Sequence, residues 1–97
     1  MYVGALELDV LFGDVASLKQ KRSLVRPVIA ELKRRFEVAA AEAGNHDVHR
    51  RSLIGVAVVS PDTAHLHRVL DSCERLVAAR PELELLSAHR RVLGPQD

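Results

Sequence analysis

Apolar residues occupy every second position at the start of the chain. Six residues fall on one face of this alternation: Tyr2, Gly4, Leu6, Leu8, Val10 and Phe12. The other face is mixed, with Val3, Ala5, Glu7, Asp9 and Leu11. A period of two with one continuous apolar face predicts a strand over residues 2–12 that lies on a core. The Gly13-Asp14 pair ends it.

The next segment has the period of a helix. Ser17, followed three residues later by Gln20, fits a capping box. An apolar stripe then recurs at Leu18, Val25, Val28, Ile29, Leu32 and Phe36. This predicts a helix over about 18–36. Pro27 interrupts the pattern, so we expect either a kink or a restart of the helix near residues 23–27.

The middle of the chain is harder to assign. Residues 37–43 are rich in alanine, which favours a helix. The preceding helix has already reached an ordinary length, however, and Gly44-Asn45 indicates a turn, so a strand is the better interpretation. Residues 44–51 form a polar loop. Residues 52–59 are the most apolar run and predict a central strand.

A second helix and a last strand follow. Ser60 is predicted to be a helix cap, Pro61 the first helical residue and Asp62 an acid in the first turn. The helix is expected over about 61–80 and the strand over 83–93. The strand alternation changes phase at Leu85-Leu86, which indicates a bulge.

The predicted order is strand, helix, strand, strand, helix, strand. Two right-handed crossovers then place both helices on one face of a four-stranded antiparallel sheet. The sequence therefore predicts a single α+β domain over residues 1–97, a ferredoxin-like βαββαβ sandwich. One sheet face is left open.

Charge is unevenly distributed. The whole chain carries +1, whereas residues 18–36 carry +6. The cations of this segment are candidate contacts for the phosphates of RNA: Lys19, Lys21, Arg22, Arg26, Lys33, Arg34 and Arg35. The alternative is a solvated helix face whose long side chains cover the edge of the core.

Lys19, Lys21 and Arg22 cluster in the first turn, where the helix dipole disfavours positive charge. We therefore expect these three to serve an anionic partner. Salt bridges to Asp14, Glu37 or Glu42 are the structural alternative.

The open sheet face is a poor platform for bases. The chain has only three aromatic residues, Tyr2, Phe12 and Phe36, so stacking of RNA bases on the sheet is not expected. Glu7 and Asp9 share this face and are a conceivable acid/base pair. Cross-strand pairing with His89, Arg90 or Arg91 is the simpler interpretation.

The polar loop holds a second group of candidates. His46, Asp47 and His49, with Arg51 after them, form a possible loop site. A metal would need further ligands with defined geometry, so neither a metal nor another cofactor is predicted. His65 and His67 point in different directions on a helix. Cys73, the single cysteine, lies on the apolar stripe of the second helix and is predicted to be a core residue. No catalytic residue is assigned.

Three stretches resemble a bacterial family, the YlxP-like proteins. Ser17-Leu18-Lys19-Gln20-Lys21-Arg22 is similar to the family's Ser-Leu-Lys-x-Lys-Arg signature. Ala41-Glu42 through Asp47 and then Arg51 is similar to a second motif, and Gly55 to Ser60 to a third. The chain departs from the family at Gly44-Asn45-His46, where Asp-His-Gln is common, and at His49, where tryptophan is common.

The resemblance implies a ferredoxin-like fold without an established activity. Genes of the family often lie beside translation genes, which implies an RNA or ribosome connection by association. Together with the basic helix, this favours a non-enzymatic RNA- or ribosome-associated factor. A protein- or ligand-binding module acting through the open sheet face or residues 44–51 is the alternative. An enzyme using Glu7, Asp9 or the histidine loop is third.

Two expectations concern the state of the chain. The residue 52–59 strand is apolar on both faces and Val3, Ala5 and Leu11 add to the open side, which predicts a homodimer. No run of residues is long and apolar enough for a membrane span, and no signal peptide is recognised, so a cytoplasmic location without membrane contact is expected.

Overall fold

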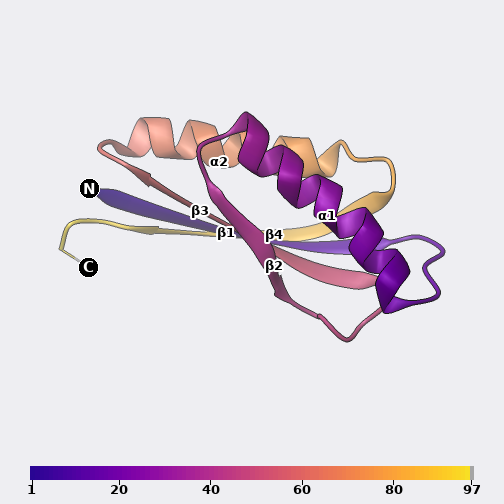
Figure 1. Cartoon of the computed structure of the whole chain (residues 1–97). Coiled ribbons are helices and arrows are strands. Elements are labelled where there is room, and N and C mark those ends of the chain that lie inside the picture. The colour runs from indigo at the N-terminus through magenta and orange to yellow at the C-terminus, as the bar shows by residue number, and fades with distance from the viewer. Residues whose placement is uncertain (97) are drawn as a thin grey trace.

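A computed structural model describes residues 1–96 (Figure 1). The elements are β1 (Tyr2–Phe12), α1 (Leu18–Arg35), β2 (Ala39–Gly44), β3 (Arg51–Ser60), α2 (Thr63–Ala78) and β4 (Leu83–Leu93). The four strands form one antiparallel sheet in the order β2-β3-β1-β4. Both helices lie on the same face of that sheet. The predicted ferredoxin-like fold is confirmed, and the ambiguous alanine-rich segment is a strand.

The alternation in β1 determines what is buried. Its even-numbered positions face the helices, and Leu6, Leu8, Val10 and Phe12 are almost fully buried there. The residues that complete the core are Val15, Val25, Val28, Leu32, Ala40, Ile54, Val56, Val58, Leu66, Leu70, Cys73, Leu76, Val77 and Leu83. Cys73 is therefore a core residue, as predicted.

Gly4 permits close packing between β1 and α2. A Cβ atom at this position would lie 2.7 Å from Cδ2 of Leu66 and 2.9 Å from Cδ1 of Leu70. Both leucines are fully buried. Any larger residue at position 4 therefore forces part of the core to move.

α1 begins at the predicted cap. The Ser17 hydroxyl accepts a hydrogen bond from the Gln20 amide at 3.1 Å, and the Gln20 side-chain oxygen accepts one from the backbone N–H of Ala16 at 2.9 Å. Pro27 lies inside α1, which continues through it as one helix (Figure 1). Of the two effects expected of Pro27, the restart does not occur.

α2 begins two residues later than predicted. Asp62 is the N-cap, and its carboxylate accepts a hydrogen bond from the His65 amide at 2.7 Å. Pro61 lies before the helix, and the Ser60 hydroxyl instead braces the turn by donating to the Asp62 carbonyl at 2.8 Å. The prediction of Ser60 as the cap is wrong, because the Asp62 carboxylate is better placed to accept from the first free N–H groups of the helix.

Each edge strand contains one extra residue. Along β1, the partner on β4 changes from Ser87 to Leu85, so Leu86 has no residue opposite it. Along β2, the partner of Glu42 is Ile54 and that of Gly44 is Leu53, which leaves Ala43 unpaired. The bulge predicted at Leu85-Leu86 is confirmed, and the second bulge was not foreseen.

Candidate functional site

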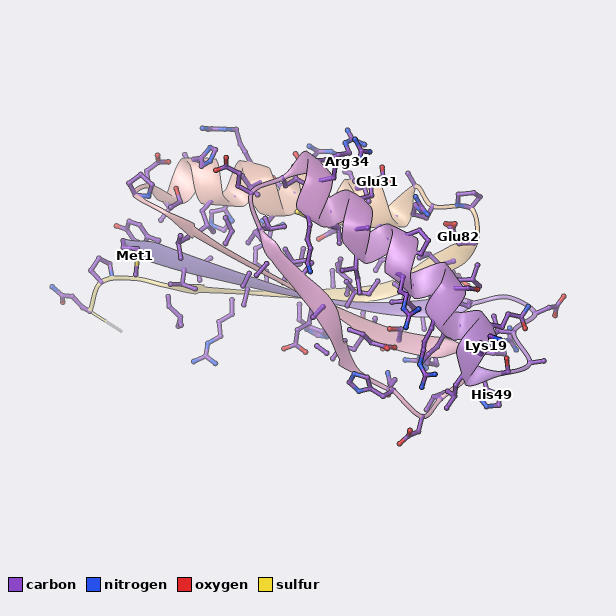
Figure 2. All side chains as sticks on the ribbon, in the orientation of Figure 1. Met1, Lys19, Glu31, Arg34, His49 and Glu82 are labelled. Carbon is purple, nitrogen blue, oxygen red and sulfur yellow. The ribbon has the colours of Figure 1, made fainter. Side chains whose placement is uncertain are left out.

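The exposed side of α1 carries a row of cations. Lys19, Arg22, Arg26 and Lys33, here called the α1 basic row, are all exposed. At 100° per residue they lie within about 60° of one another around the helix, and at 1.5 Å per residue the row is about 21 Å long. Figure 2 labels Lys19 at one end of α1 and Arg34, also exposed, at the other.

The α1 basic row has no acidic partner within residues 1–96. None of its four side chains, nor that of Arg34, forms an ion pair with the described part of the chain. The first turn of α1 contains no acid. Glu31 lies on another side of the helix, where it is bound by Arg80 at 2.7 Å and Arg35 at 3.4 Å.

Lys21 is placed differently from its neighbours. Its side chain is 1% exposed, and its ammonium group lies 3.1 Å from the carboxylate of Glu42. The same Nζ donates hydrogen bonds to the backbone carbonyls of Asn45 at 2.7 Å, Arg51 at 3.2 Å and His46 at 3.3 Å. The Glu42 carboxylate also accepts from the Ser52 hydroxyl at 2.7 Å.

This network joins α1 to the β2–β3 loop. Lys21 was expected to bind either an anionic partner or an acid of this chain. The structure shows a salt bridge to Glu42, so an external anion does not reach this ammonium group. The expectation that all three cations of the first turn face a partner is therefore corrected for Lys21. Lys21 lies four residues before Val25 and seven before Val28, on the buried stripe, and this spacing was the signal that could have revealed it.

Arg35, at the end of the helix, is also engaged. It pairs with Glu31, and its guanidinium lies 5.7 Å from the centre of the Phe36 ring. Its side chain is half exposed, so the contact is weak. Arg35 is thus less free to bind a ligand than the α1 basic row.

The β2–β3 loop does not gather its candidate residues into one site. Asn45 has a φ of 59°, a left-handed conformation that asparagine tolerates. A ring nitrogen of His46 lies 3.1 Å from the Glu42 carbonyl, which braces the turn. Asp47 and His49 are exposed, and Figure 2 shows His49 close to the Lys19 end of α1. Arg51 belongs to β3 instead.

Arg51 forms an ion pair on the open sheet face. Its Nε donates to Oδ1 of Asp9 at 3.1 Å, and Nη2 binds the other carboxylate oxygen. The hydrogen bonds to Asp9 are the main reason that the pKa of Arg51 lies above its ordinary value. The predicted partners of Asp9 were wrong: Asp9 pairs with Arg51, its diagonal neighbour on β3, whereas the residue opposite it on β4 is the uncharged Ser87.

Glu7, the other member of the predicted acid pair, and Arg90 of the last strand lie on opposite faces of the sheet. Glu7 lies opposite His89 in the register of β1 and β4, without an ion pair in the described chain. Arg90 faces α2 and binds Asp71 at 2.8 Å, with Nη1 3.0 Å from Nδ1 of His67. Within residues 1–96, no three histidine, cysteine or acidic residues are grouped as a metal site would require.

One half of the open sheet face is made of small, apolar residues. Ala39, Ala57 and Ala5 lie side by side across three strands, and Ala41 and Gly55 continue the surface. These residues line a shallow depression of about 320 Å³. Val59, at its end, is 62% exposed.

Of the helices in residues 1–96, neither has the length and hydropathy that a bilayer crossing needs.

Two sequence comparisons match most of this chain. Residues 3–90 match the family described as a protein of unknown function (DUF503). The chain is also 27% identical over 82 residues to the uncharacterized protein YlxP of Bacillus subtilis (strain 168), an alignment that covers 84% of this chain and 89% of that protein. The chain therefore belongs to the DUF503 family, which includes the YlxP-like proteins that the three sequence motifs indicated.

Proposed function

We propose that this protein is a non-enzymatic RNA-binding factor that holds the phosphate backbone through α1. The observation that carries the proposal is the absence of acidic partners around the α1 basic row within residues 1–96. Elsewhere in the described chain, several cations are paired: Lys21, Arg35, Arg51, Arg80 and Arg90. A row left unpaired on one helix is positioned for an external polyanion.

The position of the row also carries a cost. Cations near a helix N-terminus are disfavoured by about 0.3–1 kcal/mol each at an exposed site. Lys19 lies in the first turn and Arg22 directly after it, with no acid in that turn to offset them. Binding of a phosphate near the start of α1 removes this penalty, because the helix dipole and both cations then face a negative charge.

The proposed contacts are the four residues of the α1 basic row and Arg34. Lys21 is excluded because it is buried, and Arg35 is secondary because it is paired. No residue is assigned a catalytic role. The connection to the ribosome rests on the family resemblance alone.

The test compares two variants with the same loss of charge. Arg22→Gln/Arg26→Gln removes the centre of the α1 basic row, whereas Arg68→Gln/Arg75→Gln removes two exposed cations from α2. Each protein is purified from its native cells with and without ribonuclease, and the bound RNA is quantified. We expect wild type and the second variant to retain RNA and the first to lose it. Equal RNA in both variants, or none with wild type, contradicts the proposal.

A second candidate concerns the open sheet face. We propose that a second copy of this chain covers it in a two-fold dimer. Small residues line the β2–β3 half, whereas Glu7, His89 and Arg91 occupy the β1–β4 half. We place the two-fold axis parallel to the strands and midway between β3 and β1. The half with large side chains in each copy then packs against the half with small side chains in the other.

The size of the face is compatible with such a dimer. Four strands about 4.8 Å apart and six to eleven residues long give about 600 Å² per copy. The total is close to the lower limit for a specific interface, about 1,000–1,200 Å². Both helices lie on the opposite face of the sheet, so α1 stays accessible in the dimer (Figure 1).

Sedimentation velocity at micromolar concentration tests the dimer. Ala57 lies at the centre of the small half, and Ala57→Glu should produce a monomer. Ala64→Glu, on the exposed surface of α2, is the control and should remain dimeric. A monomeric wild-type protein under these conditions refutes the second candidate without affecting the first.

A further inference from the structure

The α1 basic row carries information about the form of the RNA. Resting on the function proposed above, we infer that the row binds double-stranded RNA in preference to single strands. Three features of α1 favour the duplex: the side chains beside the row, the rigidity of the row and its length.

Within residues 1–96, no phenylalanine or tyrosine ring is fully exposed beside the row. Phe12 is fully buried, and Tyr2 and Phe36 are half-buried at the ends of β1 and α1. One side of the Phe36 ring is already occupied by Arg35. Proteins that hold single strands gain about 1–3 kcal/mol for each base stacked on an aromatic side chain. A single strand on α1 gains mainly phosphate contacts, because the exposed ring nearest the row is the small imidazole of His49, whereas the bases of a duplex are already stacked on each other.

The polar side chains at the start of α1 are already used within the helix. Gln20 caps the backbone of Ala16, and Ser17 caps Gln20. The Ser23 hydroxyl donates to the Gln20 carbonyl at 2.6 Å. These groups are therefore not free to read the edges of unpaired bases. Double-stranded RNA does not require such reading, because it is recognised largely by shape and backbone.

The row is also a rigid array. Both ends of α1 are capped, by Ser17 and by a hydrogen bond from the Phe36 N–H to the Leu32 carbonyl at 3.0 Å. The helix is anchored beneath the row by Lys21 and by its buried apolar stripe. A rigid array favours a ligand whose phosphates are also fixed, because a flexible strand must be ordered before it can match it.

The length of the row is consistent with both strands of a duplex. Its outer cations, Lys19 and Lys33, are about 21 Å apart along the axis of α1. The major groove of A-form RNA is narrower than that of B-form DNA, which is about 12 Å wide. The row is therefore long enough to contact phosphates on both sides of a groove, which a lone strand cannot present.

Fluorescence anisotropy with two RNA probes tests the inference. One probe is a labelled 20-base-pair RNA duplex and the other is its labelled strand alone, chosen without self-complementarity. We expect wild type to bind the duplex at least about tenfold more tightly than the strand. Arg22→Gln/Arg26→Gln should weaken duplex binding and lower the slope of log affinity against log salt by about two, because two phosphates are no longer neutralised. Arg68→Gln/Arg75→Gln, on the exposed surface of α2, should leave both quantities unchanged.

The outcomes separate the inference from the function on which it rests. Equal or tighter binding of the single strand that disappears in Arg22→Gln/Arg26→Gln overturns the preference for a duplex and leaves RNA binding by α1 in place. Binding to neither probe, or an equal decrease of affinity in both variants, overturns the proposed function itself.

Discussion

Replacing Lys21 with methionine should lower the stability of this domain far more than the same replacement of its exposed neighbour Lys19. Methionine keeps the apolar part of the lysine side chain and removes the ammonium group. The Glu42 carboxylate, 16% exposed, then loses its cation, and three backbone carbonyls lose a donor. We expect the free energy of unfolding to fall by about 3–5 kcal/mol, the usual cost of breaking a buried ion pair.

The individual hydrogen bonds support that magnitude. An ammonium group has three hydrogens, so at most three of its four neighbouring oxygens are fully bonded at once. Hydrogen bonds that involve a charged group contribute about 1.5–3 kcal/mol each. Their sum exceeds the expected effect, because the variant no longer has to bury the ammonium charge, and this recovers part of the loss.

Urea unfolding followed by circular dichroism measures the difference. With a slope of about 1.5 kcal/mol per molar urea, the expected loss moves the midpoint by about 2–3 M. Lys19→Met is the matched control and should leave stability unchanged or raise it by up to about 1 kcal/mol, because it removes a cation from the start of α1. Glu42→Gln added to Lys21→Met should restore part of the loss, because the unpaired carboxylate charge is removed. If Lys21→Met behaves like Lys19→Met, the buried network does not stabilise the fold.

Three further effects follow from the packing and the caps. Gly4→Ala should lower the free energy of unfolding by about 1–3 kcal/mol through overpacking, whereas Gly13→Ala, with no atom within 4 Å of the added carbon, should change it little in the same urea assay. Asp62→Ala should cost about 1 kcal/mol because α2 loses its cap, and no loss would contradict that role. Burial raises the pKa of Cys73 to about 11 from an ordinary 9.0. The unfolded chain therefore loses the thiol proton first, and stability should fall by about 2 kcal/mol more in wild type than in Cys73→Ala as the pH rises from about 9 to about 11. Parallel curves for the two proteins would exclude this.

Much of the fold was predictable because its core-facing positions repeat so regularly. Alternation over residues 2–12 places the inner face of β1 correctly, and the change of phase at Leu85-Leu86 marks a real bulge. The segment 37–43 was ambiguous because alanine favours a helix in isolation. Pairing of Ala39 and Ala41 with β3, which no local pattern reveals, makes it a strand.

The charged contacts were less predictable because they depend on register. Asp9 meets Arg51 only after β1 and β3 have aligned, and no local pattern in the sequence measures that alignment. Lys21 was counted with the surface cations because lysine is rarely buried. Its burial depends on four oxygens supplied by β2, the loop and β3, which lie more than twenty residues away along the chain.

The two bulges have a consequence for how the protein behaves when it is concentrated. β2 and β4 are the edges of the sheet, and unpaired backbone groups on such edges invite other chains to extend the sheet. Ala43 and Leu86 each break the regular ladder of an edge, and the short β2 leaves few consecutive residues for pairing. A bulge also increases the local twist, so a second flat strand fits poorly against either edge. Growth of the sheet into fibrils through its edges is therefore hindered at both ends.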